Sequence, residues 1–450
     1  MSASQLVDPI SSLLPPELIT KIFQLCIPQL AQIPLADVLS TPISIDLCRR
    51  RHNITAEGPV LLCRVSRTWK DFVYDCPMLW TNICAHASSA LRNPNAFSSW
   101  LARSGNLPLA VCISLDLLHH IDVFTIIFNC SARIRFLKFL NITGEDMTWD
   151  LTSSLFTQLD TFAVESLYVD EDPLPNLLDM ISAIITTAPH LRSIRWNLDD
   201  APTPLVTIGS QLKELDFSTD VPDERMYNVL RACPNVVKLI VKYYSDMEPT
   251  GGGDVLLADL QILYSYSFAM RGVVAPKLRR FAFSGHSDLT PNLLPFIQHS
   301  PQLDDLDLNL TYADHDLIQM MHHLSPIARL KIIVRTLDPI FLTNEMFKTL
   351  TFHREGGAGG CLLPNLRHLD LRIEFFDSRP FDINGILLVN MLESRCHCPD
   401  APIAPDGVVL SHLESFTFLG AGIITHEARQ HLQSLQLQAP GLSLHINAPV

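Results

Sequence analysis

A short apolar template, L-x-x-L-x-L, recurs along most of this 450-residue chain and constrains its fold more than any other feature. The template allows Ile, Val, Phe or Trp at its apolar positions, and ten copies begin at Ile134, Leu159, Leu191, Leu212, Val236, Leu278, Leu303, Ile327, Leu366 and Leu413. A weaker copy begins at Leu432. Alternating apolar residues over so short a run are typical of a strand, so each copy predicts one strand.

A proline stands two residues before the first apolar position in five of these copies. Stretches with helical apolar spacing precede several copies, over residues 177–187, 227–233, 293–299 and 317–324. Because proline cannot continue a helix, each unit is predicted to be a helix, a proline stop and a strand. One helix and one strand cannot bury their apolar faces alone, so stacked units must share a core. We therefore predict an α/β solenoid over residues 131–450, with parallel strands on its concave side and helices on its convex side.

The repeated unit resembles the leucine-rich repeat, whose period of roughly 20–29 residues agrees with several of the spacings. The usual asparagine after the last apolar position is replaced, for example by Asp199 and Thr311, so the array is irregular. Long spacings predict insertions near residues 245–274, 353–361 and 395–407. The first two contain glycine clusters, but neither cluster has the lysine and hydroxyl pair of a phosphate-binding loop.

Charged residues flank the apolar positions of several predicted strands. Since successive side chains of a strand point to opposite faces, these side chains are expected on the concave face. The candidates for contact with a protein client are Lys238, Lys242, Arg280, Asp305, Asp307, Arg329, Lys331, Asp370 and Arg372. Neighbouring bands often have opposite charge, so the alternative is cross-strand pairing that only keeps the sheet soluble and in register.

A different pattern lies ahead of the repeats. A helix can begin at Pro15 or Pro16 without losing a hydrogen bond, and Glu17 in the first turn suits the positive end of the helix dipole. Apolar residues then follow at helical spacing, in a stripe broader than one neighbour needs: Leu18, Ile19, Ile22, Phe23 and Cys26. This helix is predicted to be buried on more than one side.

A second helical stretch spans residues 60–74, stops before Pro77 and leads into a short apolar turn at residues 78–80. With the first helix it resembles the F-box, whose pattern is Leu-Pro-x-Glu-Leu, an Ile-Phe pair, a Val-x-x-x-Trp helix and a closing Leu-Trp. The matching residues are Leu14, Pro15, Glu17, Leu18, Ile22, Phe23, Val65, Trp69, Leu79 and Trp80. The resemblance implies a three-helix module, here residues 1–85, that binds the Skp-type adaptor of a cullin-RING ubiquitin ligase.

Proline-rich residues 28–59 interrupt the F-box spacing and are predicted to be an inserted loop. Residues 100–109 resemble the segment that follows the F-box in many receptors from mushroom-forming fungi, and residues 86–130 are expected to connect module and repeats. By resemblance, the adaptor-binding residues are Leu14, Pro15, Glu17, Leu18, Ile22, Val65, Trp69, Leu79 and Trp80. The alternative is a small helical cap on the solenoid, in which the tryptophans serve only as core.

The net charge of the chain is −14, from 33 basic and 47 acidic residues, which disfavours partners such as nucleic acids and anionic membranes. The chain begins without a secretory signal and has no apolar run long enough to span a bilayer, so a soluble cytoplasmic or nuclear protein is expected. Its 11 cysteines are scattered, as in reduced proteins. The one cluster, at residues 396–398, lacks a second ligand pair, so neither a metal nor a cofactor is expected.

No catalytic constellation stands out. The histidine pairs at residues 119–120 and 322–323 lack the spacing of a metalloprotease helix, and no G-x-S-x-G elbow is present. The preferred hypothesis is a non-catalytic substrate-recognition subunit of a ubiquitin ligase, whose repeats hold a protein client. Two alternatives remain: a leucine-rich-repeat scaffold or inhibitor with no ligase attached, and a hydrolase with an active site inside the α/β fold.

Overall fold

A computed structural model of the chain defines its fold. It describes residues 14–27, 58–85, 93–114, 121–140, 155–165, 175–197, 209–219, 224–243, 254–266, 272–285, 289–310, 315–324, 326–336, 339–351, 362–375, 381–396, 411–420, 422–439 and 441–447. The chain divides into two compact units, Met1–Phe217 and Ser218–Val450.

The first unit begins with the predicted helical module. Helix α2 (Pro16–Cys26) starts at the prolines, with Glu17 in its first turn. Residues 58–63 are also helical, and they are followed by α5 (Arg67–Tyr74) and the 3-10 helix η2 (Pro77–Trp80). The single helix predicted over residues 60–74 is wrong, because Ser66 interrupts it. The Ser66 hydroxyl accepts a hydrogen bond from the Trp69 N–H and so caps α5.

Ile27 and Gly58, which lie near the two ends of the loop predicted over residues 28–59, are close together. Ile27 follows α2 and is buried, and a Cβ built on Gly58 would lie 3.0 Å from the Ile27 Cγ1. The helix at residues 58–63 therefore begins beside the end of α2, so residues 58 and 59 of the loop predicted over residues 28–59 are helical. Residues 28–57 lie outside the described part of the chain.

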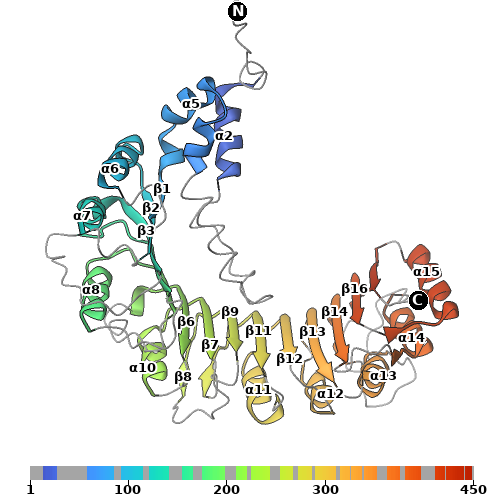
Figure 1. Cartoon of the computed structure of the whole chain (residues 1–450). Coiled ribbons are helices and arrows are strands. Elements are labelled where there is room, and N and C mark those ends of the chain that lie inside the picture. The colour runs from blue at the N-terminus through green and yellow to red at the C-terminus, as the bar shows by residue number, and fades with distance from the viewer. Residues whose placement is uncertain are drawn as a thin grey trace, which may run out of the picture. The chain divides into compact units, whose positions relative to one another are not determined.

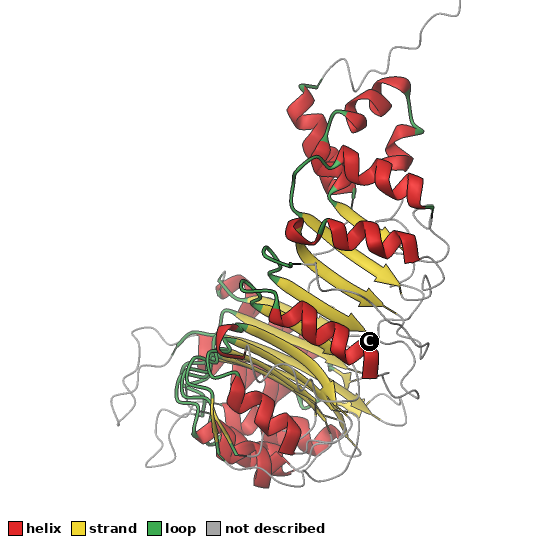
Figure 2. Cartoon of the chain, turned by 90° about the vertical axis from the view of Figure 1, so that its left-hand side faces the viewer, coloured by secondary structure: helices red, strands yellow, loops and turns green. Residues whose placement is uncertain are grey.

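The sheet begins in the same unit. Its strands are β1 (Asn82–Ala85), β2 (Leu109–Ser114), β3 (Ile134–Leu140), β4 (Thr161–Glu165), β5 (Ser193–Asn197) and β6 (Glu214–Thr219). The helical segments between them are α6 (Pro94–Arg103), α7 (Ile121–Asn129), η5 (Ser131–Arg133), α8 (Pro175–Thr186) and η6 (Gly209–Gln211). Helices α6, α7 and α8 lie on one side of the strands (Figures 1 and 2).

The second unit continues with strand, helix and strand. Its strands in the long sheet are β7 (Lys238–Tyr243), β9 (Ile262–Tyr266), β11 (Arg280–Gly285), β12 (Asp305–Leu310), β13 (Arg329–Thr336), β14 (His368–Phe375), β16 (Ser415–Gly420) and β18 (Ser443–Asn447). Its helices are α10 (Glu224–Ala232), α11 (Leu289–Gln298), α12 (His315–Met321), α13 (Pro339–Leu350), α14 (Gly385–Cys396) and α15 (His426–Gln438). Two small parallel sheets pair β8 (Val255–Leu256) with β10 (Val273–Val274), and β15 (Phe381–Asp382) with β17 (Gly422–Ile423).

Fourteen strands of the described residues form one sheet, and their spatial order is their order in the sequence. Neighbouring strands pair in parallel, as between β12 and β13 or β13 and β14. In the second unit, α11, α12 and α13 lie along one face of the strands (Figure 1). This succession of parallel strands with intervening helices confirms the predicted solenoid organisation.

All ten strong copies of the template mark a strand. Nine of these strands begin two residues after the first apolar position, as β12 does after Leu303, and β3 begins at that position itself, Ile134. The weak copy at Leu432 is wrong, because that residue lies inside α15. Four strands of the long sheet were not predicted, namely β1, β2, β9 and β18, nor were the short strands of the two small sheets. Strand β9 lies inside the expected insertion at residues 245–274, and β1 and β2 extend the sheet into the module and the expected connecting segment. The other two expected insertions lie almost wholly outside the described residues.

The core lies between strands and helices. Leu306, Leu308, Leu330 and Ile332 are fully buried on one face of β12 and β13, at alternate positions of each strand. Aromatic residues serve the same role in the first unit, where Phe139 and Phe162 meet edge to face with centroids 5.8 Å apart. No helix in the described part of the chain is both long and apolar enough to cross a membrane.

Candidate functional site

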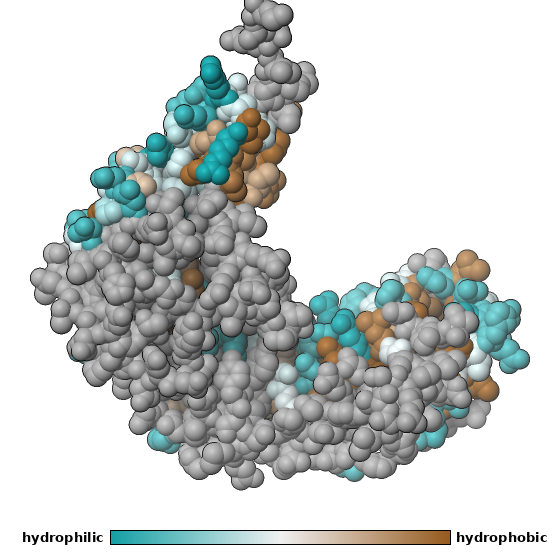
Figure 3. Space-filling model, viewed as in Figure 1, coloured by the Kyte–Doolittle hydropathy of each residue, from teal (hydrophilic) through white to brown (hydrophobic). Residues whose placement is uncertain are grey.

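Helix α2 has two apolar faces, and only one of them is buried. Ile19 and Phe23 are 1% and 2% exposed, and the Phe23 ring packs on Trp69 of α5 at a centroid distance of 4.7 Å. In contrast, Leu18, Ile22 and Leu25 are 48%, 42% and 81% exposed. These three residues recur at i, i+4 and i+7 and therefore form one stripe on the helix surface. We call them the apolar stripe; Figure 3 shows hydrophobic surface over this part of the module.

Further exposed apolar side chains belong to the same module. Among the described residues, those between 14 and 80 with large exposed apolar side chains are Leu18, Ile22, Leu25, Leu61, Val65, Tyr74 and Met78. The thioether of Met78 lies 3.4 Å from the Gln24 amide nitrogen, so the η2 turn reaches α2. A cluster of exposed apolar residues on a small module is a common mark of a protein-binding surface.

The predicted adaptor-binding residues divide into two groups. Pro15, Glu17, Leu18, Ile22 and Val65 are exposed, and Leu14 is half-buried at the start of α2. Trp69 is half-buried against Phe23. Leu79 and Trp80, in contrast, are 3% and 2% exposed. They cannot be contacted from outside without unfolding, so the docking surface considered below does not include them.

The burial of Trp80 has a clear structural cause. Its indole N–H donates a 2.7 Å hydrogen bond to the Val73 carbonyl, which closes the module. Its own carbonyl accepts a 2.9 Å hydrogen bond from the Trp100 indole N–H of α6. The Arg103 guanidinium lies over the rings of Tyr74 and Trp80, 4.5 Å and 4.8 Å from their centroids. Within the first unit, these contacts join the helical module to the beginning of the sheet.

Sequence reasoning missed four exposed apolar residues of the module, Leu25, Leu61, Tyr74 and Met78. Leu25 lies one turn beyond Leu18 and Ile22 on the same side of α2, so helical periodicity was the signal that could have found it. Leu61, Tyr74 and Met78 lie outside the F-box pattern; helical spacing marks Leu61 as apolar but does not indicate that it is exposed.

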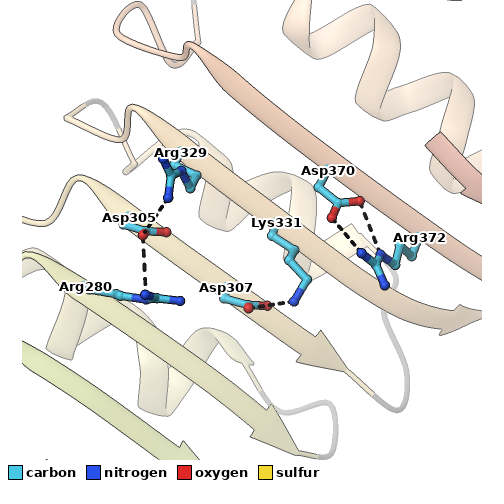
Figure 4. A network of polar contacts seen from close by, with 7 residues as sticks. All are labelled: Arg280, Asp305, Asp307, Arg329, Lys331, Asp370 and Arg372. Atoms are coloured by element: carbon cyan, nitrogen blue, oxygen red, sulfur yellow. Dashed lines mark hydrogen bonds and ion pairs between the residues drawn. The ribbon is translucent and has the colours of Figure 1, made fainter. Parts of the chain in front are cut away.

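The second candidate surface lies on the sheet of the second unit, on the face opposite its fully buried leucines. Strand alternation places the nine predicted client-binding residues on this face, and we call them the charged face. In Figure 4, Asp305 lies between Arg280 and Arg329, with carboxylate-to-nitrogen distances of 3.6 Å to each. The Lys331 ammonium lies 2.8 Å from the Asp307 carboxylate.

Pairing also occurs within a strand. Arg372 forms a two-pronged contact with Asp370 of the same strand, with nitrogen-to-oxygen distances of 3.1 and 3.3 Å. The cross-strand pairing offered as the alternative explanation of these charges is therefore present for Arg280, Asp305, Arg329, Asp307 and Lys331. This pairing leaves open their use by a partner, because several of the side chains remain accessible. Arg329 is the most open, with 58% of its side chain exposed.

A shallow hollow of about 330 Å³ opens between β13, β14 and β16. Its polar lining consists of Arg329, Lys331, His368, Asp370, Ser415 and Thr417. His368 Nδ1 and the Ser415 hydroxyl lie 2.9 Å apart in a hydrogen bond. A second hollow, of about 480 Å³, shares Arg329 and His368 as lining residues and extends to Arg367 and Ser411.

The electrostatics of the charged face centre on Asp305. Burial raises the pKa of its carboxyl above the ordinary value of 3.8, although the guanidinium groups of Arg280 and Arg329 act in the opposite direction. The two arginines therefore compensate only part of the cost of placing this charge in the sheet.

Metal binding and thiol chemistry find little support in the described residues. No group of three or more His, Cys, Asp or Glu side chains that could hold a metal occurs there, and of the cluster at residues 396–398 only Cys396 is described. Burial raises the pKa of the Cys233 thiol to about 12, so that this thiol stays protonated at neutral pH and is a poor nucleophile.

Comparisons with known proteins leave the family open. The chain matches no protein-family model and no curated protein sequence. Among solved structures, an internalin of Listeria monocytogenes aligns over 87% of this chain and 89% of its own, with 15% identity and a TM-score of 0.34. The Drosophila Toll–Spätzle complex aligns over 82% of this chain and 46% of its own, with 12% identity and a TM-score of 0.38. These likenesses are too weak to argue from, so the solenoid is argued from the chain's own repeats and strand order.

Proposed function

We propose that this protein is a non-catalytic substrate-recognition subunit of a cullin-RING ubiquitin ligase. The helical module docks on a Skp-type adaptor, and the sheet of the repeats binds a protein client. Ubiquitin transfer is then promoted because the client is held close to the donor, which raises its effective concentration. The repeat unit itself supports the coarser statement, that the chain is a protein-binding repeat scaffold.

The observation that carries the proposal is the apolar stripe of α2. Burial of a leucine or isoleucine side chain stabilises a protein by about 1.5–3 kcal/mol, so a folded helix that leaves three of them exposed forgoes a large gain. A partner that covers Leu18, Ile22 and Leu25 recovers that gain in the complex. The stripe lies on the helix that carries the Leu-Pro-x-Glu-Leu resemblance, which is why an adaptor of the Skp type is the proposed partner.

The docking surface is narrower than the F-box resemblance alone implies. It comprises the apolar stripe together with Leu14, Pro15 and Val65, and it excludes Leu79 and Trp80. Glu17 and Lys21 are exposed on the same helix, so charges border the apolar residues. An apolar centre with a polar rim is the usual composition of a protein interface.

The test uses the full chain co-expressed with a Skp-type adaptor. The double variant Leu18→Ser/Ile22→Ser is expected to weaken adaptor binding by at least about 2 kcal/mol, or roughly thirtyfold in Kd. The matched control is Ile386→Ser/Leu437→Ser, which removes two apolar side chains that are 73% and 85% exposed on α14 and α15. The control is expected to bind the adaptor as the unmodified chain does.

Thermal unfolding followed by circular dichroism checks that both double variants remain folded, since all four positions are exposed. A folded stripe variant that captures the adaptor as well as the control does would refute the proposed docking surface. If the unmodified chain captures client proteins but no adaptor or cullin, the scaffold without a ligase becomes the better description.

A further inference from the structure

The charged face has a net charge opposite to that of the chain. Its nine charged side chains comprise six basic residues, Lys238, Lys242, Arg280, Arg329, Lys331 and Arg372, and three acidic residues, Asp305, Asp307 and Asp370. The net charge of the face is therefore +3, whereas that of the whole chain is −14. Among these nine residues basic side chains outnumber acidic ones, which favours partners of negative charge.

The ion pairs do not neutralise this excess. The single carboxylate of Asp305 is shared by Arg280 and Arg329, at 3.6 Å from each, which exceeds ordinary hydrogen-bond length. Arg329 is 58% exposed at its side chain, and the Lys331 side chain beside it is 30% exposed. The Arg329 guanidinium can therefore pair with an incoming anion and still keep Asp305 as a neighbour.

The hollow beside Arg329 offers hydrogen-bond donors for such an anion. Arg329 and Lys331 line one side, and His368, Asp370, Ser415 and Thr417 line the other. The Asp370 carboxylate is already held by the Arg372 guanidinium. Its volume of about 330 Å³ lies at the lower end of the range of small-ligand pockets, so it suits a single side chain rather than a larger ligand.

We infer that this hollow receives the anionic side chain of an acidic protein segment, a carboxylate or a phosphate. Arg329 and Lys331 provide the charge, and the hydroxyls of Ser415 and Thr417 donate hydrogen bonds. A protein segment is favoured over a nucleic acid because Asp305, Asp307 and Asp370 alternate with the cations, and would repel a continuous phosphate backbone. The inference rests on the proposed function only in taking the sheet as the client surface.

The experiment measures binding of short fluorescein-labelled peptides to the full chain by fluorescence anisotropy. The probes are a glutamate-rich peptide, the same sequence with phosphoserine in place of glutamate, and the same sequence with glutamine. The unmodified chain is expected to bind one or both anionic peptides at least about tenfold more tightly than the glutamine peptide. The tighter of the two identifies the anion as a carboxylate or a phosphate, and added salt is expected to weaken binding.

The test variant is Arg329→Gln/Lys331→Gln, and its matched control is Lys277→Gln/Lys348→Gln. The control removes the same charge from two exposed, ion-paired lysines of the same unit that are not part of the charged face. The test variant is expected to lose at least about tenfold in affinity for the anionic peptide, and the control to lose less than about twofold.

Equal binding of anionic and glutamine peptides, or equal losses in the test and control variants, would overturn the inference. So would tighter binding of a single-stranded DNA oligonucleotide that is lost in the test variant. Adaptor capture by the same variants is expected to be unchanged, so failure of this inference is distinguishable from failure of the proposed function.

Discussion

The indole N–H of Trp100 donates a 2.9 Å hydrogen bond to the carbonyl of Trp80, and the two rings meet edge to face with centroids 4.9 Å apart. Trp80 is also followed by Ile83 and Ala85 at the spacing of the repeat template, and all three are buried. Trp80 is thus both the last residue of the helical module and the first apolar position of the template copy that marks β1. Deletion of the module would expose Trp100 and the edge of β2, so point variants are the better tests of its function.

Substitution of Trp80 by alanine is expected to destabilise the first unit rather than to remove a binding contact. Loss of a fully buried tryptophan lowers the free energy of unfolding by about 3–5 kcal/mol, measured by urea unfolding followed by circular dichroism. Met78→Ala, at a neighbouring position that is 55% exposed, is the control and should change that value by less than about 0.5 kcal/mol. A Trp80→Ala chain with unchanged stability but no adaptor binding would return Trp80 to the docking surface.

The strands that sequence patterns predicted have bulky apolar residues at all three template positions. The missed ones break the template for physical reasons. Strand β9 has the buried Ser265 at its last apolar position, and β1 has Ala85 there. Strand β18 has Gly441 at its first apolar position, and a shift of register between Leu109 and Ala110 displaces the pattern in β2. The weak copy at Leu432 fits the strand template and also a helix, since residues three apart lie on the same face of a helix.

The candidate surfaces were only partly predictable. The sequence showed that α2 has apolar residues on more than one side. It did not show which of them are exposed, because Leu18 and Ile19 are equally apolar. Only the position of α5, with Trp69 against Phe23, decides which face is covered. Strand alternation alone predicted that the nine charged residues share one face of the sheet. Its ion pairs depend on strand register, which the sequence does not specify.

The contact between α14 and α15 gives a sharp prediction. A Cβ placed on Gly385 would overlap the Cβ of Ala428, so these helices approach too closely for any larger residue at that position. Gly385→Ala is expected to lower the free energy of unfolding by about 1–3 kcal/mol through overpacking. Gly441→Ala is the matched control, because a Cβ there meets nothing within 4 Å.

A second substitution tests the cause of that effect. Ala428→Gly removes the opposing methyl group, so the double variant Gly385→Ala/Ala428→Gly is expected to recover much of the stability that Gly385→Ala loses. Recovery should be incomplete, since glycine within α15 itself costs about 1 kcal/mol. If the double variant is as unstable as the sum of the two single variants, the two helices do not meet at these residues.

Arg395 is expected to be among the most sensitive positions of the second unit. It is 0% exposed, and its guanidinium donates hydrogen bonds to the carbonyls of Leu350, Leu362 and Leu363. Replacement by methionine leaves these carbonyls without this donor, at about 1–3 kcal/mol each, so a loss of at least about 3 kcal/mol is expected in urea unfolding. Lys348→Met, an exposed substitution on α13, should change stability little; equal losses would contradict this role of Arg395.

The last prediction concerns alkaline pH and the ion pair of Lys138 with Glu165, whose charged atoms lie 2.7 Å apart. Burial lowers the pKa of Lys138, but the negative charge of Glu165 and its hydrogen bond raise it by more. The pKa of Lys138 therefore lies above its ordinary value of 10.5. Because the folded pKa exceeds the unfolded one, the stability from this proton is full below 10.5 and is lost as pH rises through the folded pKa.

The measurement compares the unmodified chain with Lys138→Met in urea unfolding at a series of alkaline pH values. Groups shared by both chains cancel, so the difference in the free energy of unfolding is expected to be constant up to about pH 10.5 and to fall above it. A Glu165→Gln background removes the largest contribution that raises the pKa of Lys138, so the fall should begin at lower pH. A difference that stays constant across the alkaline range would mean that the ion pair does not raise the pKa of Lys138.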